Sequence, residues 1–381
     1  MGKKIKKGKR GEVTQYITRS RAIRKLQLSL KDFRRLCILK GIYPREPKKK
    51  FKGNTTTYYH VKDINFLAHE RILTKFREIQ SHMRKYKKTL RRGEKLKAKN
   101  MLDNKPTYTL NHLIKERYPT FVDALRDLDD PLCLINLFAL FPSHKDFTIP
   151  NERIQNCMRL AREFNLYVIQ SQSLRKVFLS IKGIYYQVEI MGQTMTWITP
   201  YQFPQNLPQD VDYKVMLTFL EFYETLMKFV NFKLYGQLDL KYPPFENSAG
   251  QLEEEQYWSY KTFKLELAKK GNEIQAQEDE KYQISKQFEE TSEEVKQLLN
   301  REGFNGKDLF KGLKFFLNRE VPRTSLEFVI LSFGGEVYWE DDGSEIKEDS
   351  NLITHFVTDR SPKDLKMLKH RYCYKFLDDN F

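Results

Sequence analysis

Residues 118–142, YPTFVDALRDLDDPLCLINLFALFP, constrain the fold more than any other stretch of the chain. From Leu132 onward this stretch is apolar except for Asn136, so a helix there has no solvent-facing side and should run through the centre of a domain. The apolar run is far shorter than the roughly 20 residues that span a bilayer. Two helix starts precede it, because Thr120 can act as an N-cap and Asp130-Pro131 suits a first helical turn.

The charge is distributed unevenly along the sequence. The whole chain carries +17, but residues 1–100 contain 32 Lys or Arg against 7 Asp or Glu, a net charge of +25, which leaves −8 for the rest. A surplus sustained over 100 residues indicates a polyanionic partner, either nucleic acid or an anionic membrane, whereas single charge runs are usually solvated surface. The N-terminus lacks the apolar segment of a signal peptide, and Lys6 stands where a myristoylation motif needs Ser or Thr. We therefore favour nucleic acid.

The strongest candidate for a nucleic-acid contact is a basic helix. A long helix capped by Asp63 is predicted, and its apolar face thins beyond Ile79. From Arg84 to Lys99 nine residues are basic and Glu94 is the only acid, whereas a solvated helix usually mixes charges for pairing. Such a helix is anchored at one end and offers its other end to a polyanion.

Three basic segments supply the candidate RNA-binding residues: the N-terminal tail, which could equally be a nuclear address, the loop after the first helix, and the basic helix. The candidates are Lys3, Lys4, Lys6, Lys7, Lys9, Arg10, Lys48, Lys49, Lys50, Lys52, Arg84, Lys85, Lys87, Lys88, Arg91 and Arg92. Aromatic residues lie between them, and aromatic rings can stack on unpaired bases.

The rest of the N-terminal region reads as α+β, mostly helical with a small antiparallel meander. Ser29 should cap a helix that Gly41 ends. Further helices are expected over 151–164 and 211–230, and strands over 166–171, 174–181, 184–191 and 194–199, with Lys182–Gly183 as a hairpin turn. After Pro243-Pro244, residues 251–302 hold 13 acids and 8 bases and read as a charged linker with helical tendency.

A β-α-β pattern begins near Phe310. Strand 314–317 precedes a helix that Thr324 should cap and Gly334-Gly335 should end, and strands 336–339 and 354–358 follow. Ser361-Pro362 is a helix start.

The stretch 118–142 resembles the Pescadillo family, and so do residues 26–47, 174–204 and 312–337, in the family's order over nearly the whole chain. The C-terminal pattern resembles a BRCT domain, a parallel four-stranded α/β module. The resemblance implies four parts: a basic tail and first helix (1–50), the remainder of the Pescadillo N-terminal domain (51–250), an acidic, charged linker (251–304) and a truncated BRCT-like domain (305–381).

Two departures from the BRCT pattern stand out. A BRCT domain should continue into a further strand and a last helix carrying a Trp, but the chain stops at Phe381. Three interpretations of this end are open: a fragment, a faulty gene model or a short natural form. We expect a destabilised module with one sheet face uncovered. Phosphopeptide-reading members carry Ser or Thr and Gly where this chain has Asn318-Arg319-Glu320, so Arg319 and Arg323 are instead possible contacts to rRNA phosphates or an acidic partner.

The sequence offers no catalytic or metal-binding motif. The seven His are scattered, the four Cys are far apart, and Asp127, Asp129 and Asp130 are interpreted as helix caps. No cofactor, small-molecule substrate or membrane partner is expected.

The resemblance implies a non-enzymatic scaffold of large ribosomal subunit assembly in the nucleolus and nucleoplasm. Its partners would be pre-rRNA and pre-ribosomal particles, the block-of-proliferation WD-repeat protein and a second WD-repeat partner with a ubiquitin-like domain. Its role would be maturation of large-subunit rRNA precursors, including second internal transcribed spacer processing. We expect the two WD-repeat partners, which are β-propellers, to bind the exposed side of residues 118–199. The alternative is a BRCT-based protein-interaction adaptor in chromatin or checkpoint signalling; an enzyme has no positive support in the sequence.

Overall fold

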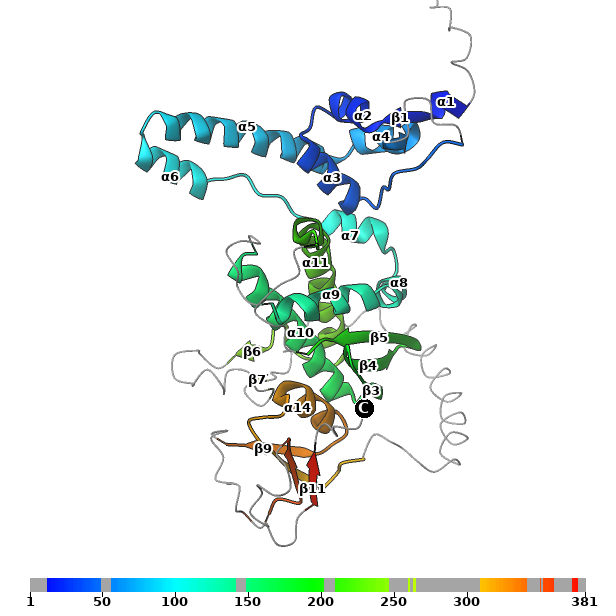
Figure 1. The fold of residues 1–381 in the computed structure, drawn as a ribbon, viewed down its shortest axis with the longest axis vertical. Helices are drawn as coiled ribbons and strands as arrows, with labels where there is room; N and C mark the ends of the chain where they lie inside the picture. The colour runs from blue at the N-terminus through cyan, green and yellow to red at the C-terminus, as the bar shows by residue number, and fades with distance from the viewer. Residues whose placement is uncertain are drawn as a thin grey trace, which may run out of the picture. The chain divides into compact units, whose positions relative to one another are not determined.

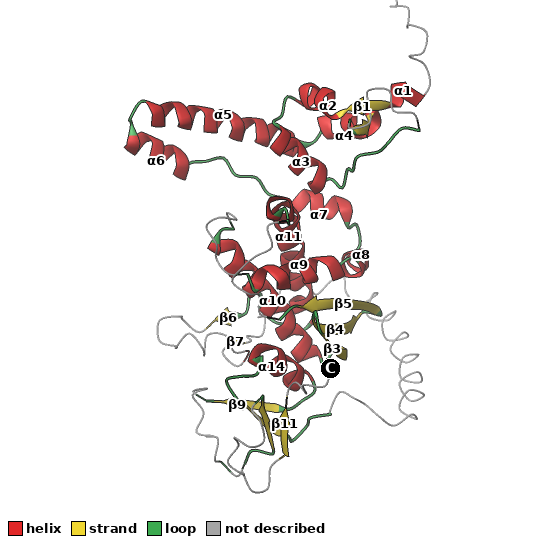
Figure 2. Cartoon of the chain, in the orientation of Figure 1, coloured by secondary structure: helices red, strands yellow, loops and turns green. Residues whose placement is uncertain are grey.

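Two compact units make up the computed structural model of the chain, and neither is continuous in sequence. One takes residues 1–119 and 208–225, and the other takes 120–207 and 226–381. The structure describes residues 12–48, 56–141, 149–201, 210–246, 260, 263–264, 309–340, 350, 352–359 and 372–375. Figure 1 labels the elements along the chain, and Figure 2 shows that helices predominate.

The first unit is mostly helical. Its elements are α1 (Glu12–Gln15), β1 (Tyr16–Thr18), α2 (Arg19–Leu26), α3 (Leu30–Leu39), β2 (Tyr58–His60), α4 (Val61–Ala68), α5 (Arg71–Arg91), α6 (Lys95–Asp103), α7 (Asn111–Arg117) and the first half of α11 (Tyr213–Gln237). Strand β1 pairs antiparallel with β2. The predicted caps of α3 are confirmed: Ser29 Oγ accepts a hydrogen bond from Asp32 N at 3.1 Å, and Gly41 follows the helix with φ of 66°.

The single long helix expected from Asp63 is wrong, because the chain forms two helices there. Helix α4 ends at Ala68 and α5 begins at Arg71. The carboxylate of Glu70 accepts a hydrogen bond from Arg71 N at 3.0 Å, so Glu70 supplies the N-cap of the second helix. Asp63 lies within the first turn of α4, whose N-cap is His60.

The second unit holds the remaining elements. They are α8 (Phe121–Arg126), α9 (Asp129–Ala139), α10 (Asn151–Ser171), β3 (Leu174–Ser180), β4 (Gly183–Ile190), β5 (Gln193–Thr199), the second half of α11, β6 (Phe245–Glu246), β7 (Phe263–Lys264), β8 (Lys314–Leu317), α14 (Arg323–Ser332), β9 (Glu336–Trp339), β10 (His355–Thr358) and β11 (Tyr372–Lys375). The expected α+β character, helix-rich with small antiparallel sheets, is confirmed.

Helix α9 is the central helix that its apolar sequence predicts. Leu132, Ile135 and Phe138 are fully buried. The buried amide of Asn136 donates from Nδ2 to the Leu132 carbonyl at 2.8 Å, which satisfies the one polar side chain within the apolar run. The helix begins at Asp129, one residue before the predicted Asp130 cap, and Leu128 takes the N-cap position.

The antiparallel meander β3-β4-β5 packs beside α9. Residues 166–171, predicted to be a strand, are instead the last turns of α10, since Leu166, Tyr167 and Val168 continue its buried face. The hairpin turn lies at residues 181–182, one position earlier than expected. Gly183 opens β4 with φ of 147°, and a Cβ there would lie 2.4 Å from the Thr199 carbonyl oxygen, so this position requires glycine.

A parallel four-stranded sheet in the order β11-β10-β8-β9 closes the second unit. Gly334 and Gly335 end α14 as predicted, although the helix begins at Arg323, before the expected Thr324 cap. The expectation that the chain stops before a further strand is wrong, because β11 pairs with β10. Residues 360–371, which include the expected helix start, lie outside the described residues.

One member of the predicted linker also belongs to this unit. Tyr260 donates its backbone N–H to Glu327 Oε1 at 3.0 Å, and its hydroxyl accepts a hydrogen bond from Asn165 Nδ2 at 2.9 Å. Its ring lies against Phe328 of α14. The other residues of 251–304, apart from 263–264, lie outside the described residues.

We predict that Leu132→Ala in α9 lowers the free energy of unfolding by about 2–5 kcal/mol, because the substitution leaves a cavity in a fully buried position. Leu96→Ala is the matched control, since Leu96 is 82% exposed, and its cost should stay within about 0.5 kcal/mol. Urea denaturation followed by circular dichroism measures both. Equal costs for the two variants would show that α9 does not form the core.

Candidate nucleic-acid interface

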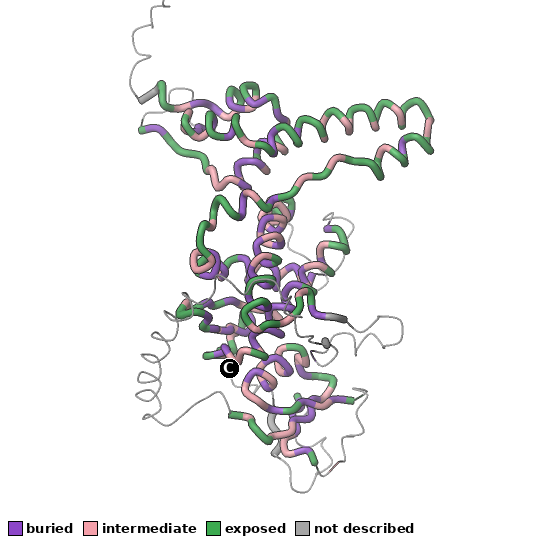
Figure 3. The backbone as a smooth tube through the Cα atoms, turned by 180° about the vertical axis from the view of Figure 1, so that it is seen from behind, coloured by how far each residue is buried: buried purple, intermediate pink, exposed green. Residues whose placement is uncertain are grey.

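Helices α5 and α6 form a helical hairpin, residues 71–103, which we call the basic hairpin. The two helices lie side by side in Figure 1, and Gly93, with φ of 78°, allows the tight turn between them. His82 Nε2 lies 2.6 Å from the Met101 carbonyl oxygen, and Ala98 of α6 is buried. Figure 3 shows that most of the remaining hairpin surface is exposed.

The base of the hairpin is held by apolar packing. Ile72, Leu73 and Phe76 in the first turns of α5 are buried. Arg77 donates from Nη2 to the Leu26 carbonyl at 2.8 Å, which ties α5 to the end of α2. The predicted change from an anchored amphipathic half to an exposed half is therefore present within α5.

A buried ion network stabilises the same base. Lys40 Nζ lies 2.5 Å from Glu70 Oε2 and 2.7 Å from Glu116 Oε2, and His112 Nε2 lies 2.8 Å from Glu70 Oε1. The Lys40 ammonium also stands 4.6 Å from the centre of the Phe66 ring. The side chains of Lys40 and Glu70 are only 5% and 7% exposed, so water contributes little to their solvation. The network connects α3, α7 and the start of α5.

Burial and hydrogen bonding act in opposite directions on Glu70. Burial alone would raise the pKa of its carboxyl group, but hydrogen bonds from Lys40 and His112 and their charges outweigh burial and lower that pKa below its usual value. The carboxylate is therefore the stable form of Glu70 in the folded protein.

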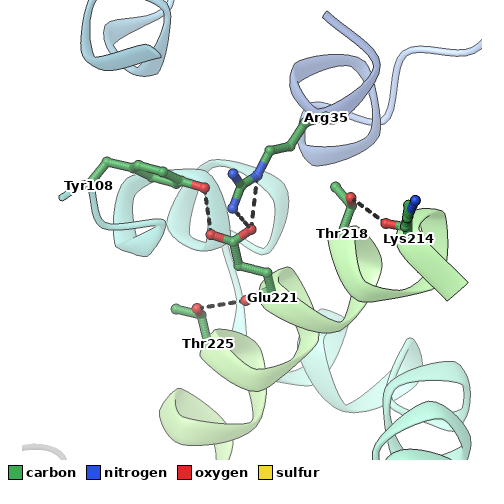
Figure 4. Close-up of polar contacts among 6 residues, drawn as sticks. All are labelled: Arg35, Tyr108, Lys214, Thr218, Glu221 and Thr225. Atoms are coloured by element: carbon green, nitrogen blue, oxygen red, sulfur yellow. Dashed lines mark hydrogen bonds and ion pairs between the residues drawn. The ribbon is translucent and has the colours of Figure 1, made fainter. Parts of the chain in front are cut away.

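A second cluster joins α3 to α11 (Figure 4). Glu221 accepts hydrogen bonds from the Arg35 guanidinium, with Nε at 3.1 Å, and from the Tyr108 hydroxyl at 2.6 Å. The guanidinium carbon of Arg35 lies 5.7 Å from the centre of the Phe76 ring and 5.2 Å from that of Tyr108. Phe76 belongs to α5, so this cluster also fixes the base of the basic hairpin.

The exposed half of α5 and its C-cap residue carry six of the predicted RNA-binding residues, and all six are exposed. They are Arg84, Lys85, Lys87, Lys88, Arg91 and Arg92. At 100° per residue these positions fall within an arc of about 160° around the helix. His82, Tyr86 and Thr89 lie on the opposite side, where His82 and Thr89 contact α6 through Met101. We call this set of six residues the basic arc.

No acidic group within the described part of the chain neutralises the basic arc. None of the six side chains forms an ion pair or a hydrogen bond with another described residue. Elsewhere on the exposed half of the hairpin, Lys97 lies 3.3 Å from Glu94, an ordinary surface pair between neighbouring turns. The basic arc is therefore a concentrated positive surface that remains available to a polyanion.

The other predicted RNA-binding residues are not brought to this surface by any described contact. Lys48 is exposed in the loop after α3. Lys3, Lys4, Lys6, Lys7, Lys9, Arg10, Lys49, Lys50 and Lys52 lie outside the described residues.

Arg319 and Arg323 belong to the second unit, where both already contact neighbouring side chains. Arg319 Nε lies 3.1 Å from Glu340 Oε2, and the guanidinium carbon of Arg323 lies 5.1 Å from the centre of the Trp339 ring. Both line a cavity of about 490 Å³ between α10 and α14. This cavity could not be predicted from the sequence, because its walls come from segments up to about 200 residues apart.

Neither a membrane span nor a metal site emerges from the described residues. No helix among them combines the length and apolar character needed to cross a bilayer. Nor does any group of three or more His, Cys, Asp or Glu side chains within them lie close enough to hold a metal ion.

Comparison with known proteins gives one consistent result. The family model described as the Pescadillo N-terminus matches residues 6–280. A Pescadillo homolog of Arabidopsis thaliana is 46% identical over 379 residues, covering 93% of this chain and 64% of the relative. Homologs from Nematostella vectensis and Schizosaccharomyces pombe are 47% and 45% identical, covering 98% and 94% of this chain and 75% and 67% of their own lengths. The chain thus spans about two thirds of the Arabidopsis relative.

The described residues define a helix-rich α+β protein that presents an unneutralised basic surface on a helical hairpin. The matched region includes the basic hairpin, the central helix α9 and the antiparallel meander. The chain belongs to the Pescadillo family.

We predict that Glu70→Gln lowers the free energy of unfolding at neutral pH by about 2–4 kcal/mol, because it leaves the buried Lys40 with only one carboxylate. Since folding lowers the pKa of Glu70, its contribution is complete above the usual value of 4.5 and disappears as the pH falls through the lower folded value. Urea denaturation between pH 7 and pH 3 measures the effect.

Glu78→Gln is the matched control for this measurement. Glu78 pairs with Lys75 on the exposed side of α5 at 2.8 Å, so its loss should change stability by less than about 0.5 kcal/mol. A difference between wild type and Glu70→Gln that stays constant down to pH 3 would contradict the ion network as the source of stability.

Proposed function

We propose that this chain is a non-enzymatic scaffold of large ribosomal subunit assembly that binds pre-rRNA through the basic hairpin. The observation that carries the proposal is the basic arc, six exposed cationic side chains without an acidic partner among the described residues. Membership of the Pescadillo family supports the ribosomal setting of this surface.

The chemistry of the basic arc suits the sugar–phosphate backbone better than the bases. Lys and Arg neutralise phosphates and release condensed counterions, which makes binding strongly dependent on salt. The arc itself contains no aromatic side chain, and Tyr86 of the same helix lies on the opposite side. Stacking on unpaired bases is therefore not available to this face of α5, and the contact should depend on charge and shape.

The wider role we propose follows the family. The scaffold takes part in maturation of large-subunit rRNA precursors, including processing of the second internal transcribed spacer, in the nucleolus and nucleoplasm. It works with the block-of-proliferation WD-repeat protein and with a second WD-repeat protein that has a ubiquitin-like domain. The parallel sheet β11-β10-β8-β9 with α14 supports a BRCT-like reading of the C-terminal module.

We predict that the triple variant Arg84→Gln/Lys88→Gln/Arg91→Gln binds a spacer-containing rRNA precursor more weakly than the wild-type full chain. These three residues lie within about 60° of one another on α5. Each lost phosphate contact should reduce the slope of log affinity against log salt by about 0.7–0.9, so the slope should fall by about 2–3. Filter binding or fluorescence anisotropy over a salt series measures both quantities.

The matched control removes three exposed lysines from α11, as Lys214→Gln/Lys228→Gln/Lys233→Gln, which changes the net charge equally. This control should keep a slope close to that of the wild type. Equal losses in both triple variants would mean that net charge alone governs binding. Unchanged affinity and slope in the hairpin variant would refute RNA contact by the basic arc.

A further inference from the structure

Exposed apolar side chains are concentrated on the β3-β4 hairpin and the turn that follows it. Phe178 is 66% exposed, Leu179 50%, Ile181 95% and Met191 55%. Phe178 and Leu179 are neighbours in β3, so they point to opposite faces of the sheet, and no described element covers either face at this end of the strand. Large apolar side chains gathered at one place on a surface mark an interaction site more often than single ones do.

Helix α9 covers one edge of this sheet, whereas no described element covers the other. At the β5 edge, Thr196 N donates to Asp129 Oδ1 at 2.9 Å and Ile198 N lies 3.4 Å from Cys133 Sγ, so α9 covers the edge. At the opposite edge, β3 pairs with β4 alone among the described strands. Proteins usually protect an open edge with charge, a bulge or a covering element, because its free N–H and C=O groups attract other strands.

The register identifies the backbone groups at the open edge. Ser180 opposes Gly183 across a two-residue turn, a pair that is hydrogen-bonded in such hairpins. The pairing then alternates, so Phe178 faces β4, and Val177 and Leu179 direct their N–H and C=O groups away from it. No described backbone group outside the sheet bonds to either residue. A regular stretch of edge that no described residue occupies therefore coincides with the exposed apolar side chains.

Charged groups around this edge are mainly basic. Lys176 and Lys182 are exposed and form no ion pair with a described residue. Arg175 is paired with Glu189 at 3.2 Å across the sheet. A strand added at this edge would therefore be favoured by acidic side chains on the face that carries Lys176 and by apolar side chains on the opposite face, next to Val177 and Leu179.

We propose that the open edge of β3 binds an extended segment of a partner protein, in which apolar and acidic residues alternate, as a fourth strand of the meander. Main-chain hydrogen bonds to Val177 and Leu179 would provide affinity, and the apolar and basic side chains would provide selectivity. This site is distinct from the basic hairpin, and it stands whether or not that hairpin binds RNA.

The test uses the full chain and a capped nine-residue peptide that alternates Glu and Val. We expect dissociation constants in the micromolar to low millimolar range, with slowed amide exchange confined to residues 174–180. Leu179→Pro removes the edge-facing N–H while keeping the bonds to β4, and it should weaken binding at least tenfold. Leu179→Ala keeps that N–H and should weaken binding only a few-fold. An unchanged circular dichroism spectrum and an unchanged midpoint of urea denaturation show that the Leu179→Pro variant folds.

Four outcomes would overturn the proposal. The first is no binding of the Glu-Val peptide at millimolar concentration, and the second is equal binding by Leu179→Pro. The third is equal binding of a Lys-Val peptide, which would remove charge complementarity as the basis of selection. The fourth is a dimer in sedimentation velocity that Leu179→Pro dissociates, because a second copy of the chain would then be the occupant.

Discussion

Repulsion between like charges is the constraint on which the basic hairpin depends. Arg84 and Lys88, and Lys88 and Arg92, lie one helical turn apart, and such pairs destabilise an isolated helix by a few tenths of a kcal/mol each. The basic side chains on the exposed half of α5 therefore do not stabilise that part of the helix. Its order has to come from contact with α6 and from the anchored base around Phe76 and Glu70.

Three acidic side chains of this unit stabilise the base of the hairpin and leave the basic arc unpaired by them. Glu70, Glu116 and Glu221 are all engaged at the base of the hairpin, by Lys40, His112, Arg35 and Tyr108. These three carboxylates connect helices at partly or fully buried positions, where the loss of one partner of an ion pair lowers stability most. None of them reaches the basic arc, so the structure keeps anchoring and presentation of charge on separate halves of one helix.

Local sequence signals predicted the elements that depend on local physics. The Ser29 and Thr120 caps, the stop at Gly41, the apolar helix α9 and the alternating strands of the meander all follow from residues within a few positions of one another. The break between α4 and α5 did not, because Glu70 becomes a cap partly through partners 30 and 42 residues away, Lys40 and His112. The end of α10 was misplaced since Leu166 and Val168 suit a buried helix and a buried strand equally well.

For the candidate site, too, only the features that depend on local sequence could be predicted. The basic arc could be located because charge is visible in sequence. That no described acid pairs with it could not be predicted, since pairing depends on which carboxylates fold against which lysines. The open edge of β3 gave no sequence signal either. Its residues alternate as those of any half-buried strand do. Only the structure shows that α9 covers the edge of β5 while no described element covers the edge of β3.

The discontinuous units have a consequence for the order in which the chain is made. Residues 1–119 need residues 208–225 to complete their unit, and Glu221 is synthesised 186 residues after Arg35 and 113 after Tyr108. Domains generally fold as units while the chain emerges from the N-terminus. The anchor of the strongly basic first quarter therefore stays incomplete until the whole first segment of the second unit, residues 120–207, has also been synthesised.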